Sequence, residues 1–271
     1  MKKNTQNSLF CIGLKTALKT LLALLFVSGF IVVSLAVVAP RKTMQAYDAM
    51  GLTKVSYLVQ KRLYYRSSTN ENLDDLIQRA IDTNNYADQV KFIKILQAKD
   101  DYSDYVQKVD KSIKTILGER YSVYADSYDI YLKRHLVIAL YKTGEVEEAK
   151  MLAIDSVFES LSIGVDEMYV YVNLVNDDKN LDEITKQAEF TKLYNRYGLM
   201  DMLDKDIQLI DAYLVESVKD VDKAVLLDQK VKIAKIQMII YENVGDADKL
   251  ATSSENYNKW ASEAKQSMEE L

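Results

Sequence analysis

Hydrophobic residues follow two different patterns along the chain, and the change falls at residue 40. Residues 20–40 contain no charged side chain and are bracketed by Lys19 and Arg41. A helix of this length spans ~30 Å, which is the thickness of the hydrocarbon core of a bilayer. The run therefore predicts a transmembrane helix that contacts the lipid bilayer directly.

Basic residues flank the predicted span unevenly. Four lysines and no acidic residue precede it, whereas the three basic residues soon after it are mixed with Asp48. Because positively charged flanks stay in the cytoplasm, we expect a short basic cytoplasmic tail (residues 1–19), a signal-anchor helix (20–40) and an extracytoplasmic domain (41–271). The chain is thus predicted to be a single-pass protein of the cell membrane. A cleaved signal peptide is the alternative, because residues 34–36 would suit a cleavage site, although such signals usually hold only ~7–15 apolar residues.

Beyond residue 40 the apolar residues recur three and four positions apart, as at Leu73, Leu76 and Ile77. This spacing is typical of amphipathic helices, and the region holds six glycines and no proline after Pro40. Residues 168–175 also resemble a strand, but a lone strand would lack a pairing partner, so we expect a helix there. The domain is predicted to be all-α. The expected helix hairpins are residues 43–66, 72–97, 102–117, 121–160, 165–198, 200–217, 221–245 and 246–271.

Four of the glycines each follow an aromatic residue or a leucine by four positions. A glycine just past a helix end can adopt the left-handed conformation that stops the helix without a Cβ clash. The residue one turn earlier then faces the returning helix. The four pairs are Tyr47 and Gly51, Leu140 and Gly144, Tyr194 and Gly198, and Tyr241 and Gly245.

The fullest copy of this pattern covers residues 131–157. It holds an ordered set of spaced residues, namely Leu136, Leu140, Gly144, Val146 and Ala149. These positions resemble the tetratricopeptide repeat (TPR), a helix–turn–helix unit of about 34 residues. The resemblance implies that a TPR-like α-solenoid of antiparallel helix hairpins follows the transmembrane helix. Because the glycines are 93, 54 and 47 residues apart, we expect helices of unequal length.

The domain after the span is acidic. All 40 acidic residues and all but four of the 35 basic residues lie there, which gives a formal charge of −9. Binding of nucleic acid is therefore not expected, because phosphate neutralisation needs clustered basic residues. The charges are interspersed, as in residues 145–150, a pattern we interpret as a solvated helix face. The sole cysteine, Cys11, precedes the span, so the domain must be stabilised by apolar burial instead of disulfides.

Tyrosine is in excess, with nineteen in the chain, and the densest group lies on one predicted helix. Its members recur at steps of three and four residues and form one stripe, made of Tyr121, Tyr124, Tyr128, Tyr131 and His135. Such a stripe can line a groove for a peptide or partner helix, because tyrosine combines a large area with a hydrogen-bonding tip. In the family that the chain resembles, the first helices of the hairpins line such a groove. The alternative interpretation is a helix–helix seam inside the domain.

Patterns for catalysis or metal binding are weak. His135 is the sole histidine, and no cysteine lies near it to complete a zinc site. Residues 176–182 place oxygen-bearing side chains like those of a calcium loop, but Leu181 stands where that loop needs glycine, so we expect a polar connector. The chain has no phosphate-binding loop and no metalloprotease motif. No metal or small-molecule cofactor is expected.

Together these features predict a non-enzymatic scaffold or adaptor that binds a protein or peptide partner at the cell envelope. Residues 20–40 would hold it in the lipid bilayer. One alternative is an envelope enzyme such as a hydrolase, which would need a deep acid-lined pocket beside His135. Another is a structural subunit whose span pairs with other membrane helices.

Overall fold

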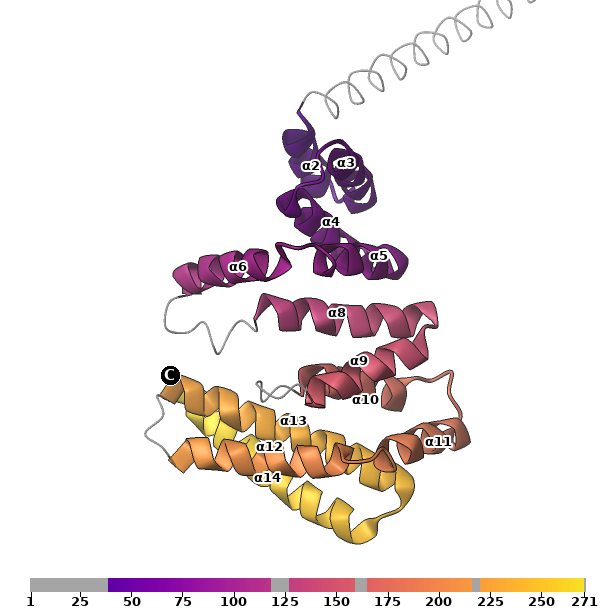
Figure 1. The fold of residues 1–271 in the computed structure, drawn as a ribbon, viewed down its shortest axis with the longest axis vertical. Helices are drawn as coiled ribbons and strands as arrows, with labels where there is room; N and C mark the ends of the chain where they lie inside the picture. Colours follow the sequence, from indigo (N-terminus) through magenta and orange to yellow (C-terminus); the bar gives the residue numbers. More distant parts are fainter. Residues whose placement is uncertain (1–38, 118–126, 159–164, 216–219, 271) are drawn as a thin grey trace, which may run out of the picture. The chain divides into compact units, whose positions relative to one another are not determined.

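The computed structural model describes residues 39–117, 127–158, 165–215 and 220–270. Throughout these ranges the regular secondary structure is helical, which confirms the prediction of an all-α fold (Figure 1). The chain divides into two compact units, residues 1–84 and 85–271. The first unit contains α2 (Pro40–Ala49), α3 (Thr53–Arg66) and α4 (Asn70–Asp82). The second contains α5 (Tyr86–Gln97), α6 (Tyr102–Leu117), α8 (Tyr128–Thr143), α9 (Val146–Phe158), α10 (Asp166–Asp177), α11 (Glu183–Tyr194), α12 (Leu199–Val215), α13 (Asp220–Val244) and α14 (Ala247–Glu269).

Each predicted hairpin overlaps observed helices, and α2, α4, α12 and α13 begin one to three residues before the predicted bounds. The hairpin prediction is wrong for 102–117, 200–217, 221–245 and 246–271, because each of these ranges holds one helix, namely α6, α12, α13 and α14. The segment expected at 165–198 forms α10 and α11, and the one expected at 121–160 forms α8 and α9, while residues 121–126 lie outside the described ranges. The strand-like stretch 168–175 is helical within α10. Its apolar side chains fall on one buried face, made of Met168, Tyr171, Val172 and Val175. Helical spacing therefore decides this stretch, in spite of its valine and tyrosine content.

In the first unit, α2 packs against α3, and α3 packs against α4. The facing sides bury a small core made of Met44, Tyr47, Tyr57, Tyr64, Leu73, Leu76, Ile77 and Ala80. A buried hydrogen bond joins α3 to α4, in which the Gln60 side-chain amide donates to the Asn72 carbonyl over 2.8 Å. The Thr69 side chain accepts from the Asn72 backbone N–H and so caps the start of α4.

In the second unit, helices that follow one another in sequence pack as antiparallel pairs, as α8 does with α9 and α9 with α10. The helix α13 additionally packs against α10, α11, α12 and α14. The centre of this unit is apolar and fully buried, and includes Phe92, Leu132, Leu140, Tyr171, Phe190, Leu193, Ile210, Ile233 and Ile240. Sequential pairing of this kind is consistent with a helical repeat.

Three of the recurring glycines stop helices in the left-handed conformation. The φ angles of Gly51, Gly144 and Gly245 are +72°, +89° and +78°. At each of them, the N–H of the next residue donates to the carbonyl four residues before the glycine. These bonds run from Leu52 to Tyr47 (2.8 Å), from Glu145 to Leu140 (2.8 Å) and from Asp246 to Tyr241 (3.0 Å). This is the Schellman closure of a helix end. Gly198 differs, because α11 already ends at Tyr194 and the glycine directly precedes α12.

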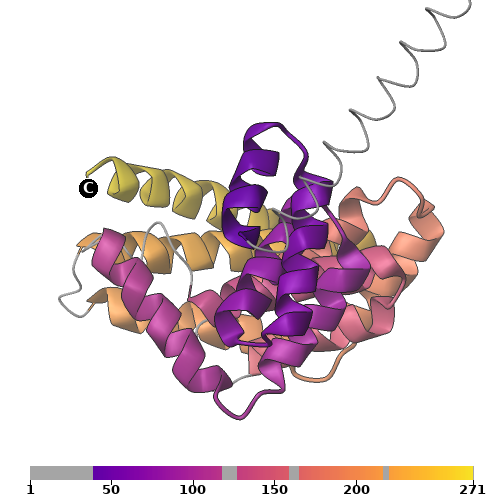
Figure 2. The ribbon, with the colours of Figure 1, turned by 90° about the horizontal axis from the view of Figure 1, so that it is seen from above.

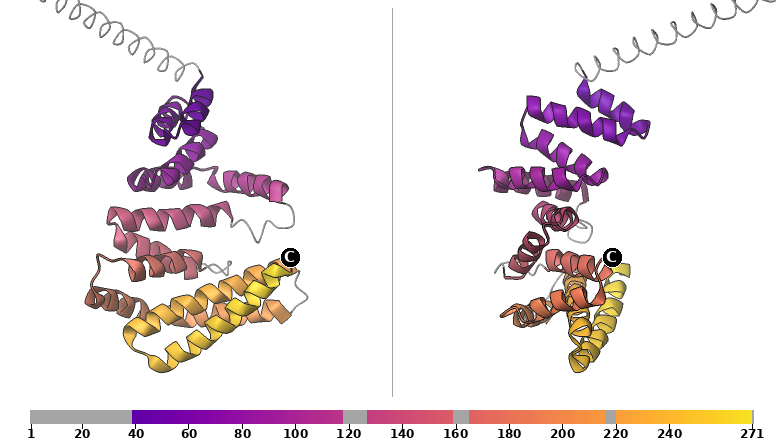
Figure 3. Two further views of the ribbon diagram at one scale, coloured as in Figure 1. Left: turned by 180° about the vertical axis from the view of Figure 1, so that it is seen from behind. Right: turned by 90° about the vertical axis from the view of Figure 1, so that its right-hand side faces the viewer.

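The last two helices, α13 and α14, lie side by side as a long hairpin (Figures 2 and 3). The residues of α14 buried most deeply recur every seven positions, at Ser253, Trp260 and Ser267. A repeat of seven is the spacing of a coiled-coil seam. Lys230 of α13 places its Nζ 4.0 Å from the centre of the Trp260 ring. Residues such as Glu255 and Lys259 on the other side of α14 are exposed, so α14 covers α13 as a capping helix does in repeat proteins.

Within the described ranges, no helix is long and apolar enough to cross a membrane. Apart from its last two residues, the predicted span 20–40 lies outside those ranges.

Candidate partner-binding site

The helix α8 carries a row of three aromatic side chains, Tyr128, Tyr131 and His135. Steps of three and four residues place them on one side of the helix. The Tyr128 and Tyr131 rings are stacked, with centres 6.0 Å apart and planes at 18°. The His135 ring meets Tyr131 edge-on, at 4.6 Å and 62°. The spacing noted in the sequence thus corresponds to direct ring-to-ring contacts.

The helix α6 adds a fourth ring to this row. Tyr105 meets Tyr128 edge-on with ring centres 6.4 Å apart. Two polar contacts fix α6 to the start of α8: the Tyr102 hydroxyl donates to Asp129, and the Tyr128 backbone N–H donates to the Asp110 carboxylate over 2.7 Å. We call Tyr105, Tyr128, Tyr131 and His135 the aromatic row.

The aromatic row runs from the interior of the domain toward its surface. Tyr105 and Tyr128 are buried, whereas Tyr131 and His135 are partly exposed. Of the five residues predicted from the sequence, Tyr121 and Tyr124 lie outside the described ranges. One end of the row is therefore fixed by packing, and the other end reaches solvent.

Electrostatics keep the exposed end of the row uncharged. Burial lowers the pKa of His135 below its usual value, and the nearby Arg134 guanidinium adds to this effect. The imidazole is therefore neutral at pH 7 and offers one hydrogen-bond donor and one acceptor. The described ranges contain no group of three or more acidic, histidine or cysteine residues that could hold a metal ion. The chemistry available in the row is thus stacking and neutral hydrogen bonding.

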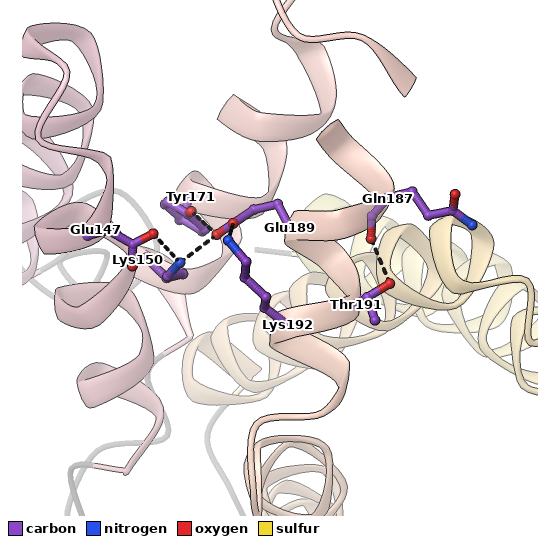
Figure 4. A network of polar contacts seen from close by, with 7 residues as sticks. All are labelled: Glu147, Lys150, Tyr171, Gln187, Glu189, Thr191 and Lys192. Carbon is purple, nitrogen blue, oxygen red and sulfur yellow. Dashed lines mark hydrogen bonds and ion pairs between the residues drawn. The ribbon is translucent and has the colours of Figure 1, made fainter. Parts of the chain in front are cut away.

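A separate polar network joins α9, α10 and α11 (Figure 4). Its centre is the Glu189 carboxylate, which accepts from the Tyr171 hydroxyl at 2.7 Å and lies 2.9 Å from the Lys150 ammonium. Lys150 also contacts Glu147 at 2.8 Å, and Lys192 lies 3.2 Å from Glu189. The network therefore connects three helices through one carboxylate.

The charges in this network are stable. Burial alone would lower the pKa of Lys150, but hydrogen bonds to Glu147 and Glu189 outweigh it and raise the pKa above its usual value. Lys150 is therefore charged at neutral pH, and its ion pair with Glu189 links α9 to α11. The interpretation of residues 145–150 as a wholly solvated face is wrong for Lys150, which is only 7% exposed. Lys150 is buried because it pairs with Glu189, which lies on another helix.

Two carboxylates of the polar connector predicted at residues 176–182 accept hydrogen bonds within the domain. Asp178 accepts from the Asn180 backbone N–H at 2.9 Å and from the Tyr141 hydroxyl at 2.8 Å. Asp182 accepts from the Thr185 N–H at 2.7 Å and caps the start of α11. These contacts engage both oxygens of Asp178 and one oxygen of Asp182.

The first unit contains an open hollow of about 420 Å³ between α2, α3 and α4. Its lining residues are Asp48, Thr53, Asp75, Gln78, Arg79, Asp82 and Thr83. The Arg79 guanidinium lies 3.0 Å from the Asp48 carboxylate. The lining carries carboxylate, hydroxyl, amide and guanidinium side chains.

The chain matches no protein-family model, and no curated protein or solved structure matches it either. The described residues define an all-helical protein with sequentially paired helices, consistent with a helical repeat.

Proposed function

We propose that this chain is a non-enzymatic scaffold, anchored in the membrane, that binds a protein or peptide partner through the aromatic row. The observation that carries the proposal is the gradient of burial along the row: Tyr128 is fixed in the interior, while Tyr131 and His135 reach the surface. Surface rings held by a rigid helix lose little conformational freedom when a partner binds, which favours recognition.

The chemistry of the row suits an extended peptide or an amphipathic helix. Tyrosine offers an apolar face and a hydroxyl tip, and both are used at protein interfaces. The neutral His135 imidazole can pair with a backbone carbonyl or N–H of the partner. We infer a partner segment with apolar or aromatic side chains that insert beside Tyr131.

The location proposed for this activity is the outer side of the cell membrane. It rests on the uncharged run at residues 20–40 and on the basic residues before it. Digestion of intact cells with an external protease tests this orientation, because an extracytoplasmic domain is cleaved only if it is exposed there. Resistance of the domain in intact cells, with cleavage after lysis, would reverse the assigned orientation.

A finer proposal concerns the architecture, which we infer to be a TPR-like α-solenoid. Its support is the glycine closure shared by Gly51, Gly144 and Gly245, together with the sequential pairing of helices. The unequal helix lengths separate this chain from a regular 34-residue repeat.

Crosslinking in native membranes tests the binding function. A photoreactive residue at position 135 should capture a partner, and Tyr131→Ala in the same chain should abolish the capture. Tyr197, which is 96% exposed and lies outside the row, provides the matched control site. Thermal unfolding of Tyr131→Ala separates the two interpretations of the stripe. A folded variant without capture supports recognition, whereas an unfolded variant shows that the row is a packing seam.

A further inference from the structure

The outer side of α3 carries apolar and basic side chains together. Steps of three and four residues join them, so they lie along one side of the helix. The two largest apolar members, Leu58 and Tyr65, are 62% and 61% exposed. All the basic members are exposed as well. Six residues make up this surface, which we call the α3 face: Val55, Leu58, Tyr65, Lys54, Arg62 and Arg66.

The opposite side of α3 is packed against protein. Ser56, Gln60 and Tyr64 are buried on that side, and α2 and α4 both pack against the helix. The ring of Tyr65 contacts the buried ring of Tyr64, with centres 5.6 Å apart and planes at 48°. The α3 face is thus directed away from both neighbouring helices, and a buried ring supports its one aromatic side chain.

Charge within the first unit is divided between two helices. α3 holds four basic residues and no acidic residue, which gives a formal charge of +4. α4 holds four acidic residues and one basic residue, which gives −3. Since the whole domain after the uncharged run carries −9, α3 is a basic helix in an acidic domain. Two copies of the α3 face repel each other, whereas an anionic surface attracts it.

The hairpin of α2 and α3 brings the α3 face back toward the start of the domain. α2 begins at Pro40, where the uncharged run ends. The closure at Gly51 reverses the chain, and α3 packs back along α2. Because α2 has ten residues and α3 has fourteen, α3 is longer by ~6 Å. The end of α3, which carries Tyr65 and Arg66, therefore returns to the level of Pro40.

We propose that the α3 face lies on the surface of an anionic phospholipid bilayer, the same bilayer in which residues 20–40 are anchored. The inference rests on the anchoring included in the proposed function. Leu58 and Tyr65 enter the headgroup layer, where tyrosine rings are favoured. The long basic side chains cover apolar surface with their stems and place their charged ends among the lipid phosphates.

Chain connectivity favours this bilayer over an acidic protein as the occupant. Only α2 and a three-residue turn separate Pro40 from the start of α3. An anchored span therefore holds the bilayer within reach of the α3 face at all times, which gives a second contact a high effective concentration. A separate protein would have to bind without that advantage.

The test uses the full-length chain with its sole cysteine replaced, as Cys11→Ser, and a single new label site. Leu58→Cys is labelled with a fluorophore that reports water exposure, and the chain is reconstituted into vesicles. The vesicles hold phosphatidylcholine alone or equal parts of phosphatidylcholine and phosphatidylglycerol. We expect the label to be shielded from water, and quenched by nitroxide-bearing headgroups, only in the anionic vesicles. Asp82→Cys, at an exposed position of the acidic α4, is the control site and should stay in water in both.

The charge of the α3 face is tested in the labelled Leu58→Cys chain. Each basic side chain near an anionic surface contributes a factor of about five to binding. Arg62→Gln combined with Arg66→Gln should therefore lower the ratio of shielded to exposed label about thirty-fold. Lys259→Gln combined with Lys265→Gln, at exposed positions of α14, changes the net charge equally and should leave the ratio unchanged. Circular dichroism checks that each variant keeps its helix content.

Separate outcomes identify which step fails. Release of the chain from the vesicles by alkaline carbonate overturns the anchoring, and this inference with it. Retention of the chain with a water-exposed label at Leu58→Cys in anionic vesicles overturns this inference alone. Shielding in native membranes but not in these vesicles shows that a protein covers the α3 face, and shielding that rises with chain density in either lipid shows a second copy. Both results overturn the proposal.

Discussion

The Lys150 ammonium lies 2.9 Å from the Glu189 carboxylate. This ion pair links α9 to α11 in a region from which water is largely excluded. The side chains are only 9% and 12% exposed. Tyr171 of α10 donates to the same carboxylate over 2.7 Å. Loss of Glu189 would leave a buried ammonium and a buried hydroxyl together without their shared acceptor.

Removal of this acceptor should be strongly destabilising. We expect Glu189→Ala to lower the free energy of unfolding by about 3 kcal/mol, because Lys150 and Tyr171 lose the buried carboxylate that they share. Lys192→Ala, at a side chain that is 63% exposed, should cost less than about 0.5 kcal/mol. Urea unfolding followed by circular dichroism measures both values. Equal effects of the two variants would show that Glu189 is solvated in the native state.

The same network should make stability depend on acid. Burial opposes the ionisation of Glu189, but hydrogen bonds from Tyr171 and Lys150 outweigh it and hold its pKa below 4.5. An acid whose pKa is lowered by folding contributes stability that is present above its unfolded pKa and is lost as the pH falls through the folded value. Between pH 5 and pH 3 the unmodified chain should therefore lose more stability than Glu189→Gln, as judged from midpoints of thermal unfolding.

Asp206 should behave in the opposite way. It lies on the buried side of α12, and burial raises its pKa from 3.8 to about 6. Its ionisation above pH 6 therefore opposes folding, and Asp206→Asn should stabilise the chain at pH 7.5 by about 1–3 kcal/mol. The gain should shrink as the pH falls below 6 and should disappear below about pH 3, where the aspartate is protonated in both states. A gain that is equal at pH 4 and at pH 7.5 would contradict this mechanism.

The glycine that closes α8 gives a prediction based on the backbone alone. A Cβ added to Gly144 would meet nothing within 4 Å, but the φ angle of +89° disfavours any other L-residue. Gly144→Ala should therefore lower the free energy of unfolding by about 1 kcal/mol. Gly144→Asn should cost less, because asparagine tolerates the left-handed region better. Chemical denaturation of the two variants checks the order, and a neutral effect of alanine would show that the turn adopts another conformation.

Much of the helical organisation could be predicted because its signals are local. The three- and four-residue spacing of Leu73, Leu76 and Ile77 lies within a single helix, and all three side chains are fully buried. Gly144 marks a turn through backbone conformation within six residues. Such features depend on residues that are close in sequence.

The features that sequence reasoning missed depend on distant partners. Lys150 looks solvated beside Glu147, and only Glu189, on another helix, explains why it is buried. Likewise Asp166 pairs with Lys232 across 66 positions of the chain. A short window contains no trace of either pair, because each side chain is compatible with a surface helix when considered alone.

The candidate site was predicted only in part, because some of its contacts are local in sequence and others come from a separate helix. The spacing of Tyr128, Tyr131 and His135 placed them on one face of a helix, and their rings are in contact. The contribution of Tyr105 was missed, since it comes from the separate helix α6. A repeated aromatic spacing on the preceding helix, with Tyr102 and Tyr105 three positions apart, is the signal that could have indicated it.

The closure at Gly51, Gly144 and Gly245 is completed by hydrogen bonds that span only six residues. The helix before each closing glycine can gain or lose whole turns without altering the turn that follows it. During evolution, insertions of three or four residues would therefore be accepted inside the helices while the glycine-closed turns stay intact. Divergent relatives are best sought by the four-residue spacing between the closing glycine and the aromatic residue or leucine before it. A fixed repeat length is a weaker search criterion.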